Sequence, residues 1–100
     1  MKYWVKTLVV EEGSNTILRC VYDDHKLEGN EIWYKGNETI NFDERVSLNK
    51  LDNFVSISNL SLIDKNVYRC VSLKNEFSNL VVVKNYRKKS KKVVPLNKKK

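Results

Sequence analysis

Two cysteines and one tryptophan constrain the fold of this 100-residue chain more than any other feature. Cys20 and Cys70 lie 50 positions apart, each in a run of alternating character, and Trp33 follows the first cysteine by 13 residues. In an antiparallel sandwich two such cysteines can face each other across the roughly 10 Å between sheets, and an indole can fill the space beside them. The spacing therefore predicts an all-β sandwich.

The approach to the second cysteine carries a further signal. Residues 64–70 read Asp-Lys-Asn-Val-Tyr-Arg-Cys, with Tyr68 two residues before the cysteine. A tyrosine at that position can turn its hydroxyl back to the backbone of the preceding corner. We expect Leu18, Trp33 and Tyr68 in the core.

Short alternating runs fill the rest of the chain, and helical periodicity is absent. There is no alanine and only one proline, and no window of about 11 residues keeps an apolar pattern at i, i+3 and i+4. Turn residues separate the runs at a spacing typical of a sandwich. We expect eight strands, at residues 3–10, 15–22, 31–35, 38–41, 45–49, 53–58, 67–73 and 78–86.

Charge divides the chain into two parts. The formal net charge is +7, but nine basic and no acidic residues follow Val83, whereas residues 1–83 hold ten basic and twelve acidic ones, a net charge of −2. We predict one domain over residues 1–85 and a basic, disordered tail over residues 86–100. No apolar run reaches the ~20 residues of a membrane-spanning helix.

The motifs of the domain resemble those of the immunoglobulin superfamily. The matching stretches are residues 12–20, 33–35, 55–62 and 64–70. The resemblance implies an immunoglobulin-like β-sandwich of two antiparallel sheets with one inter-sheet disulfide. It also implies an ion pair between Arg45 and Asp64 that closes the lower end of the sandwich.

Spacing and two unusual residues refine the resemblance. Only eleven residues separate Trp33 from Arg45, so the chain is similar to the shorter intermediate (I-set), C2-like or short variable-like domains of cell-surface receptors. Asn66 occupies a corner that the family usually fills with glycine, and we expect it to be left-handed. Glu31 occupies an inward position two residues before the tryptophan, which predicts a bulge or a register shift there.

The two cysteines can be free thiols, as in cytosolic muscle-type immunoglobulin domains, or a disulfide. Asn37 and Asn59 each begin an N-x-S/T glycosylation sequon at a predicted surface position, although such tripeptides also arise by chance in an asparagine-rich chain. The sequons favour an extracellular location, and with it a disulfide between Cys20 and Cys70.

The sequence offers little for catalysis. His25 is the only histidine and lies in a polar loop, and there is no glycine-rich phosphate loop. With the cysteines paired, a zinc site lacks ligands, and weak calcium binding by Asp23, Asp24 and Glu28 is the remaining alternative. We predict a protein that is not an enzyme and has no cofactor or metal.

One face of the sandwich is expected to bind a partner protein, since such domains most often act through the sheet that contains the last strands. Alternation predicts exposed apolar side chains on it, with Phe77 beside them in a loop. The predicted outward residues are Tyr34, Val71, Leu73, Val81 and Val83. The alternatives are that neighbouring domains cover this face, or that the parity is wrong by one residue, which would move every side chain to the other face.

The cations of the tail predict that it is attracted to polyanions such as glycosaminoglycans or anionic lipid. It places five cations in six positions: Arg87, Lys88, Lys89, Lys91 and Lys92. Nucleic acid is the least favoured partner, because no base-reading element accompanies the cations. The alternative is a linker without a function of its own.

The leading hypothesis is an extracellular recognition module, either a receptor ectodomain or a secreted decoy of the kind that large DNA viruses encode. Its partner would be a receptor, cytokine or adhesion molecule in immune or cell-adhesion signalling. A structural or adhesion domain from a tandem array is the alternative.

Overall fold

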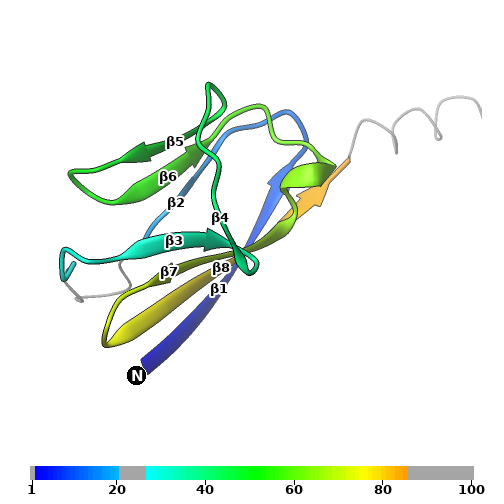
Figure 1. Cartoon of the computed structure of the whole chain (residues 1–100). Helices are drawn as coiled ribbons and strands as arrows, with labels where there is room; N and C mark the ends of the chain where they lie inside the picture. The colour runs from blue at the N-terminus through cyan, green and yellow to red at the C-terminus, as the bar shows by residue number, and fades with distance from the viewer. Residues whose placement is uncertain (1, 21–26, 86–100) are drawn as a thin grey trace, which may run out of the picture.

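Two β-sheets pack face to face in the computed structural model, which describes residues 2–20 and 27–85 (Figure 1). The larger sheet has the strand order β1-β8-β7-β3-β4, and the smaller has the order β2-β6-β5. The strands are β1 (Lys2–Glu11), β2 (Thr16–Leu18), β3 (Ile32–Lys35), β4 (Glu38–Thr39), β5 (Val46–Asn49), β6 (Phe54–Ile57), β7 (Asn66–Val71) and β8 (Asn75–Lys84), with one 3-10 turn, η1 (Leu62–Asp64), before β7. The predicted all-β sandwich is confirmed, and each expected strand overlaps an observed one.

The first and last strands pair in parallel along their whole length. Ten residue pairs join them, from Lys2 opposite Asn75 to Glu11 opposite Lys84. The other strand pairs are antiparallel. A parallel pair needs a long crossover connection, and here the rest of the domain supplies it. β1 and β4 form the two edges of the larger sheet, and β2 and β5 form those of the smaller one.

The core lies between the sheets and is tied by one covalent bond. Cys20 and Cys70 form a disulfide with their Cα atoms 5.5 Å apart, as predicted. Leu18 is fully buried beside them, and Trp33 is 5% exposed. The indole Nε1 donates a hydrogen bond to the backbone oxygen of Asn53 at 3.1 Å, so the core accommodates the polar atom of its largest side chain.

The corner before β7 is held by a buried carboxylate. Both Arg45 guanidinium nitrogens Nη1 and Nη2 lie 2.9 Å from the Asp64 carboxylate, and the Tyr68 hydroxyl donates to the Asp64 backbone oxygen at 2.6 Å. Burial raises the pKa of Asp64, but hydrogen bonds from Arg45 and from the Ser61 N–H outweigh burial and bring this pKa below 3.8. Burial, with the nearby Asp64 charge, raises the pKa of Tyr68 to about 12.

Two expectations drawn from unusual residues were wrong. Asn66 is not left-handed, because it belongs to the extended β7; among the described residues other than glycine, only Asn53 and Asn59 have positive φ. A glycine with positive φ lies nearby in the β3–β4 turn: Gly36 has a φ of +64°, and a Cβ there would come within 3.2 Å of the Asn66 side chain. Glu31 causes no bulge, since it precedes β3 and its carboxylate accepts the N–H groups of residues 28 and 29.

Within the described residues, no helix has the length and apolar character needed to cross a membrane.

Candidate functional site

The outward side of the five-stranded sheet is the candidate recognition surface, called the outer face below. The register of β7 and β8 alternates buried residues such as Tyr68, Cys70 and Val81 with residues that point away from the core. The polar members of the outer face are Thr7, Thr39, Arg69, Glu76 and Ser78. Its apolar members are Tyr3, Val5, Val9, Ile32, Tyr34, Val67, Val71, Leu80 and Val82.

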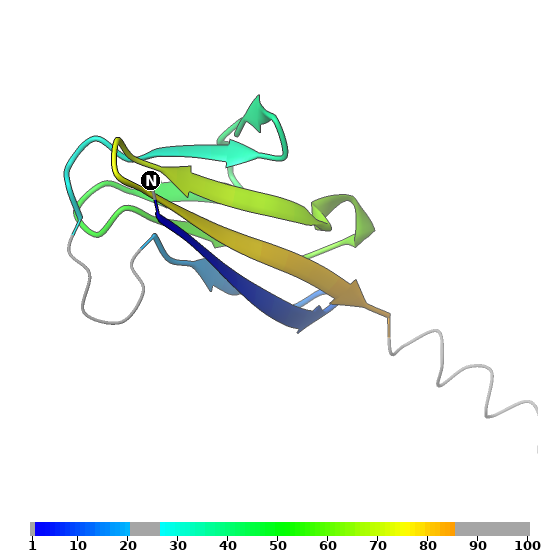
Figure 2. The same cartoon turned by 90° about the horizontal axis from the view of Figure 1, so that it is seen from below.

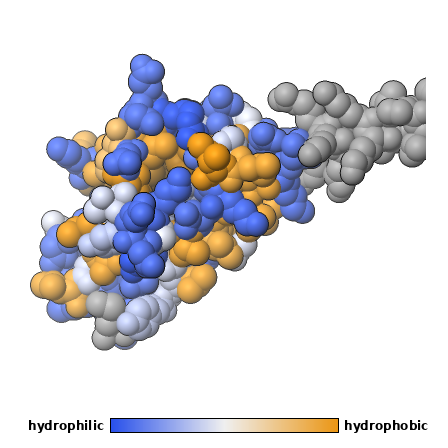
Figure 3. Space-filling view, turned by 45° about the vertical axis from the view of Figure 1, so that its right-hand side comes forward, coloured by the Kyte–Doolittle hydropathy of each residue, from blue (hydrophilic) through white to orange (hydrophobic). Residues whose placement is uncertain are grey.

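Apolar side chains are exposed across this surface. Tyr3 is 67%, Val5 69%, Val9 57% and Ile32 53% exposed, and the remaining apolar members are half-buried against one another. The space-filling view in Figure 3 shows hydrophobic residues reaching the surface between hydrophilic ones on the side that it displays. A sheet face with several exposed apolar side chains among polar ones is typical of a protein interface.

Arg69 holds the polar centre of the outer face. Its Nη1 lies 3.4 Å from a Glu76 carboxylate oxygen, its Nε donates to the backbone oxygen of Gly36 at 3.0 Å, and its guanidinium lies 5.1 Å from the centroid of the Tyr34 ring. A partly exposed ion pair adds little stability. The three contacts instead fix the direction of the guanidinium and of the ring beneath it.

The predicted binding residues divide between the two sides of the sheet. Tyr34 and Val71 lie on the outer face. Val81 is fully buried and Val83 is 8% exposed, so the prediction that they face outward was wrong. The physical reason is that residues 80–83 are all apolar and fit either parity, so only the pairing of β8 with β1 and β7 decides which of them face the core. Phe77, predicted in a loop beside the face, lies within β8 and is also 8% exposed.

The outer face contains residues that the sequence did not predict. Leu80 and Val82 point outward in β8, opposite Thr7 and Val9 of β1. Leu73 is 81% exposed, but it lies in the turn between β7 and β8 at the end of the sheet. The residues of β1 were missed altogether, because their position depends on a long-range pairing with β8 that no local pattern specifies.

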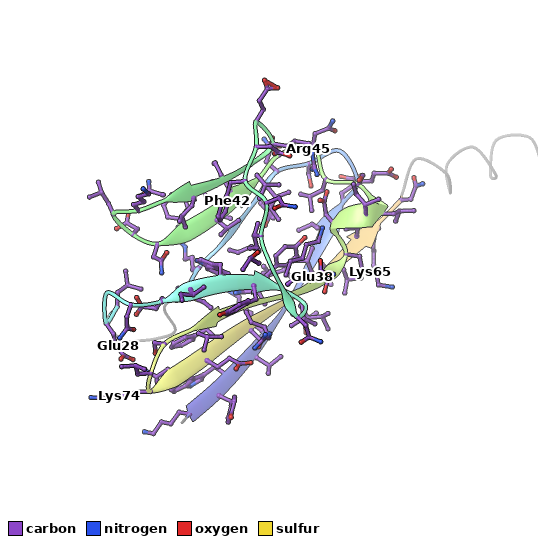
Figure 4. All side chains as sticks on the ribbon, viewed as in Figure 1. Glu28, Glu38, Phe42, Arg45, Lys65 and Lys74 are labelled. Carbon is purple, nitrogen blue, oxygen red and sulfur yellow. A yellow bond between two sulfur atoms is a disulfide. The ribbon has the colours of Figure 1, made fainter. Side chains whose placement is uncertain are left out.

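The two ends of the sandwich carry different polar clusters. In Figure 4 Arg45 lies toward the end opposite to Glu28 and Lys74. The Glu28 carboxylate accepts hydrogen bonds from the Ser72 hydroxyl at 2.6 Å and from the Asn75 amide at 3.1 Å, so it ties the segment before β3 to the β7–β8 turn.

Several predicted sites are placed by exposure alone or lie outside the described residues. Asn37 and Asn59, the sequon asparagines, are exposed, and their glycosylation stays a prediction. His25, Asp23 and Asp24 lie outside the described residues, as does the predicted tail with Arg87, Lys88, Lys89, Lys91 and Lys92. Within residues 2–20 and 27–85 no group of three or more His, Cys, Asp or Glu side chains could hold a metal ion.

A small hollow lies between the edges of the two sheets. It is lined by Trp4, Lys6 and Leu8 of β1, by Ile17 and Arg19, and by residues 77–79, and its volume is about 90 Å³. Small-molecule sites usually enclose about 300–1,000 Å³. The hollow is therefore too small to serve as a substrate pocket.

Comparison with known proteins supports the fold. No protein-family profile matches the sequence. The chain is similar to the immunoglobulin domains 1–5 of Sidekick-1 (TM-score 0.63, 16% identity, 79% of this chain and 18% of that one). It is also similar to the CD2-binding domain of CD58, lymphocyte function-associated antigen 3 (TM-score 0.64, 17% identity, 80% of this chain and 54% of that one).

A third similar structure is the Ig-like domain of human obscurin-like protein 1, with a TM-score of 0.64 and 14% identity over 82% of this chain and 78% of that one. The chain spans 18% and 54% of the first two solved chains, so it corresponds to one domain within longer molecules. These similarities support the immunoglobulin fold of the chain.

Proposed function

Because the chain has the immunoglobulin fold, we propose that it is a non-enzymatic recognition module that binds another protein through its outer face. The observation that carries the proposal is the apolar outer side of strands whose inner side already forms a closed core. Val67, Leu80 and Val82 are half-buried on that side, although no second layer of the described chain covers them. Covering apolar side chains in such a position with a partner removes their surface from water, which favours binding.

The chemistry of the outer face indicates the kind of partner that fits. Tyrosine and arginine are enriched among the residues that dominate binding energy, and Tyr34 and Arg69 lie stacked at the centre of the surface. Glu76 offers a carboxylate beside them. A complementary partner would present apolar side chains around a polar group that can hydrogen-bond to the Arg69 and Glu76 pair.

We place this module outside the cell, as a receptor ectodomain or a secreted decoy in immune or cell-adhesion signalling. The disulfide between Cys20 and Cys70 supports an oxidising compartment. The sequons at Asn37 and Asn59 support it as well. Asn37 follows Gly36 in the β3–β4 turn, and Asn59 lies in the segment after β6, so glycans at these positions would leave the outer-face strands open.

Binding to a library of cell-surface and secreted proteins, with matched charge insertions, tests the proposal. Val71→Asp and Leu80→Asp should each weaken capture of the selected partner at least about tenfold, which equals about 1.4 kcal/mol. Ser47→Asp, an exposed position on β5 of the smaller sheet, is the control and should leave binding unchanged. Loss of binding in the control but not in the outer-face variants would contradict the proposal.

A second candidate function is retention on polyanions through residues 86–100, and the density of cations in that segment favours it. We expect the full chain to bind a heparin column in a salt-dependent manner, because cations near a polyanion release counterions. Removal of residues 86–100 should abolish retention and leave protein capture by the outer face intact. Retention that survives the deletion would rule out the tail as the binding element.

A further inference from the structure

The edge strand β1 presents a row of unpaired backbone groups. The Lys2 N–H bonds to the Lys74 oxygen at 2.9 Å and the Glu12 N–H to the Lys84 oxygen at 2.7 Å, so even-numbered residues face β8. In a parallel ladder the alternate residues point the other way. The N–H and C=O groups of residues 3, 5, 7 and 9 are therefore directed to the free edge, beyond which no described strand lies.

This edge has few of the features that prevent strand addition. Natural edge strands are usually short, bulged, or protected by proline and charged residues. β1 has ten residues in unbroken register, contains no proline, and exposes Val5 and Val9 by more than half. Between its two ends, Lys6 is the single charged residue. The edge is thus a template for a further strand.

We propose that β1 pairs with β1 of a second copy of this chain, antiparallel and related by a two-fold axis. The charges at the ends of the strand set the direction. Lys2 opens the strand, and Glu11 and Glu12 close it. Antiparallel pairing brings each lysine to the partner's acidic end, whereas parallel pairing would bring like charges together.

The side chains also select one register. With Thr7 opposite the partner's Thr7, Val5 lies opposite the partner's Val9, and Lys2 lies opposite the partner's Glu12. The odd-numbered residues form the hydrogen-bonded pairs. The three central pairs are Thr7 with Thr7 and, on either side of it, Val5 with Val9, and they contribute about six backbone hydrogen bonds. A shift of two residues in one direction would oppose Lys6 to the partner's Lys6, so the repulsion of like charges disfavours it. A shift of two residues in the other direction would take Lys2 away from the partner's Glu12.

The dimer joins the two larger sheets into one continuous sheet and leaves β7 and β3 of each outer face uncovered. Its contacts run through the backbone of the edge, so it stands independently of the proposed binding by the outer face. The second copy fits this edge because each β1 supplies the hydrogen bonds, the valines and the opposite charge that the other requires.

Analytical ultracentrifugation of the full chain at physiological salt tests the pairing. We expect a concentration-dependent dimer. Val5→Pro removes an N–H that faces the edge and none that faces β8, so it should weaken dimerisation at least about tenfold while the fold is retained. Ser47→Asp on β5 of the smaller sheet is the control and should dimerise normally. A strict monomer at about 1 mM, or a dimer that tolerates Val5→Pro, would overturn the proposal.

Charge exchange and crosslinking provide readouts that do not depend on a proline. Glu12→Lys should weaken the dimer, and adding Lys2→Glu should restore it. Thr7→Cys places two thiols on the two-fold axis with Cα atoms about 5.5 Å apart, within the range for a disulfide, so mild oxidation should give a covalent dimer. Lys6→Cys should give no covalent dimer under the same oxidation. A covalent dimer formed by Lys6→Cys but not by Thr7→Cys would contradict the proposed register, and so would a charge exchange that fails to restore the dimer.

Discussion

Strands β7 and β8 contribute alternate residues to two regions, the inner side of the sheet and the outer face, which differ in what covers them. On the inner side Tyr68, Cys70 and Val81 are at most 2% exposed, and no buried side-chain nitrogen or oxygen of the described residues lacks a hydrogen-bond partner. On the outer side Val67 and Leu80 lie opposite each other in the sheet and are only half-buried. The inner layer therefore carries the stability, and the outer face remains available for binding.

Removal of the covalent bond should damage the inner layer most. The double change Cys20→Ala and Cys70→Ala is expected to lower the free energy of unfolding by about 2–5 kcal/mol. Urea denaturation followed by tryptophan fluorescence measures it. A loss below about 1 kcal/mol would show that packing alone holds the inner layer together.

Two adjacent valines give the sharpest test of the comparison. Val81→Ser buries a hydroxyl and leaves a cavity, so it should cost about 2–4 kcal/mol of unfolding free energy. Val82→Ser on the outer face, where the side chain is half-buried, should cost at most about 1 kcal/mol. Equal losses in urea denaturation would mean that the two sides of β8 are not distinct.

The ion pair at the corner should show a smaller effect with a defined pH dependence. Asp64→Asn leaves the Arg45 guanidinium without its carboxylate and should cost about 2–3 kcal/mol, because the aspartate is buried and the arginine is not. Since the pKa of Asp64 lies below 3.8 in the fold, its contribution is present above that value and is lost as the pH falls through the folded pKa. Urea midpoints in acid should therefore fall more steeply for the parent chain than for the variant.

The tyrosine of the corner should show the smallest effect. Tyr68→Phe removes one buried hydrogen bond and is expected to cost about 1–2 kcal/mol. Because the pKa of Tyr68 is raised to about 12, its contribution is complete below the ordinary value of 10.0 and is lost as the pH rises toward 12. Thermal unfolding over this alkaline range should destabilise the parent chain, while the phenylalanine variant should change less.

The sequence predicted the inner layer well because its residues leave strong local signals. Cys20, Trp33 and the tyrosine before Cys70 have few other roles in short alternating strands, and the structure brings all of them into one core. Turn residues placed the strands to within a few positions. These features depend on neighbours in sequence, so a single chain reveals them.

The outer face was predicted only in part because β8 contains no usable alternation. Residues 80–83 are all apolar, so either parity fits them. The polar Asn79 is 4% exposed and donates to the backbone oxygen of Arg19 at 3.2 Å, which reverses the usual rule that polar side chains face water. Only the pairing with β1 and β7 fixes the parity, and that pairing is a property of the whole fold.

The parallel alignment of β1 and β8 has a mechanical consequence. Figure 2 shows the two strands side by side, so the described chain starts at one end of the sheet and leaves the last strand at the other. Tension applied between Lys2 and Asn85 would pull the strands along their shared axis in opposite directions. All the backbone hydrogen bonds between the two strands would then bear the force together, so none could break before its neighbours. A domain built this way is expected to resist stretching along its length.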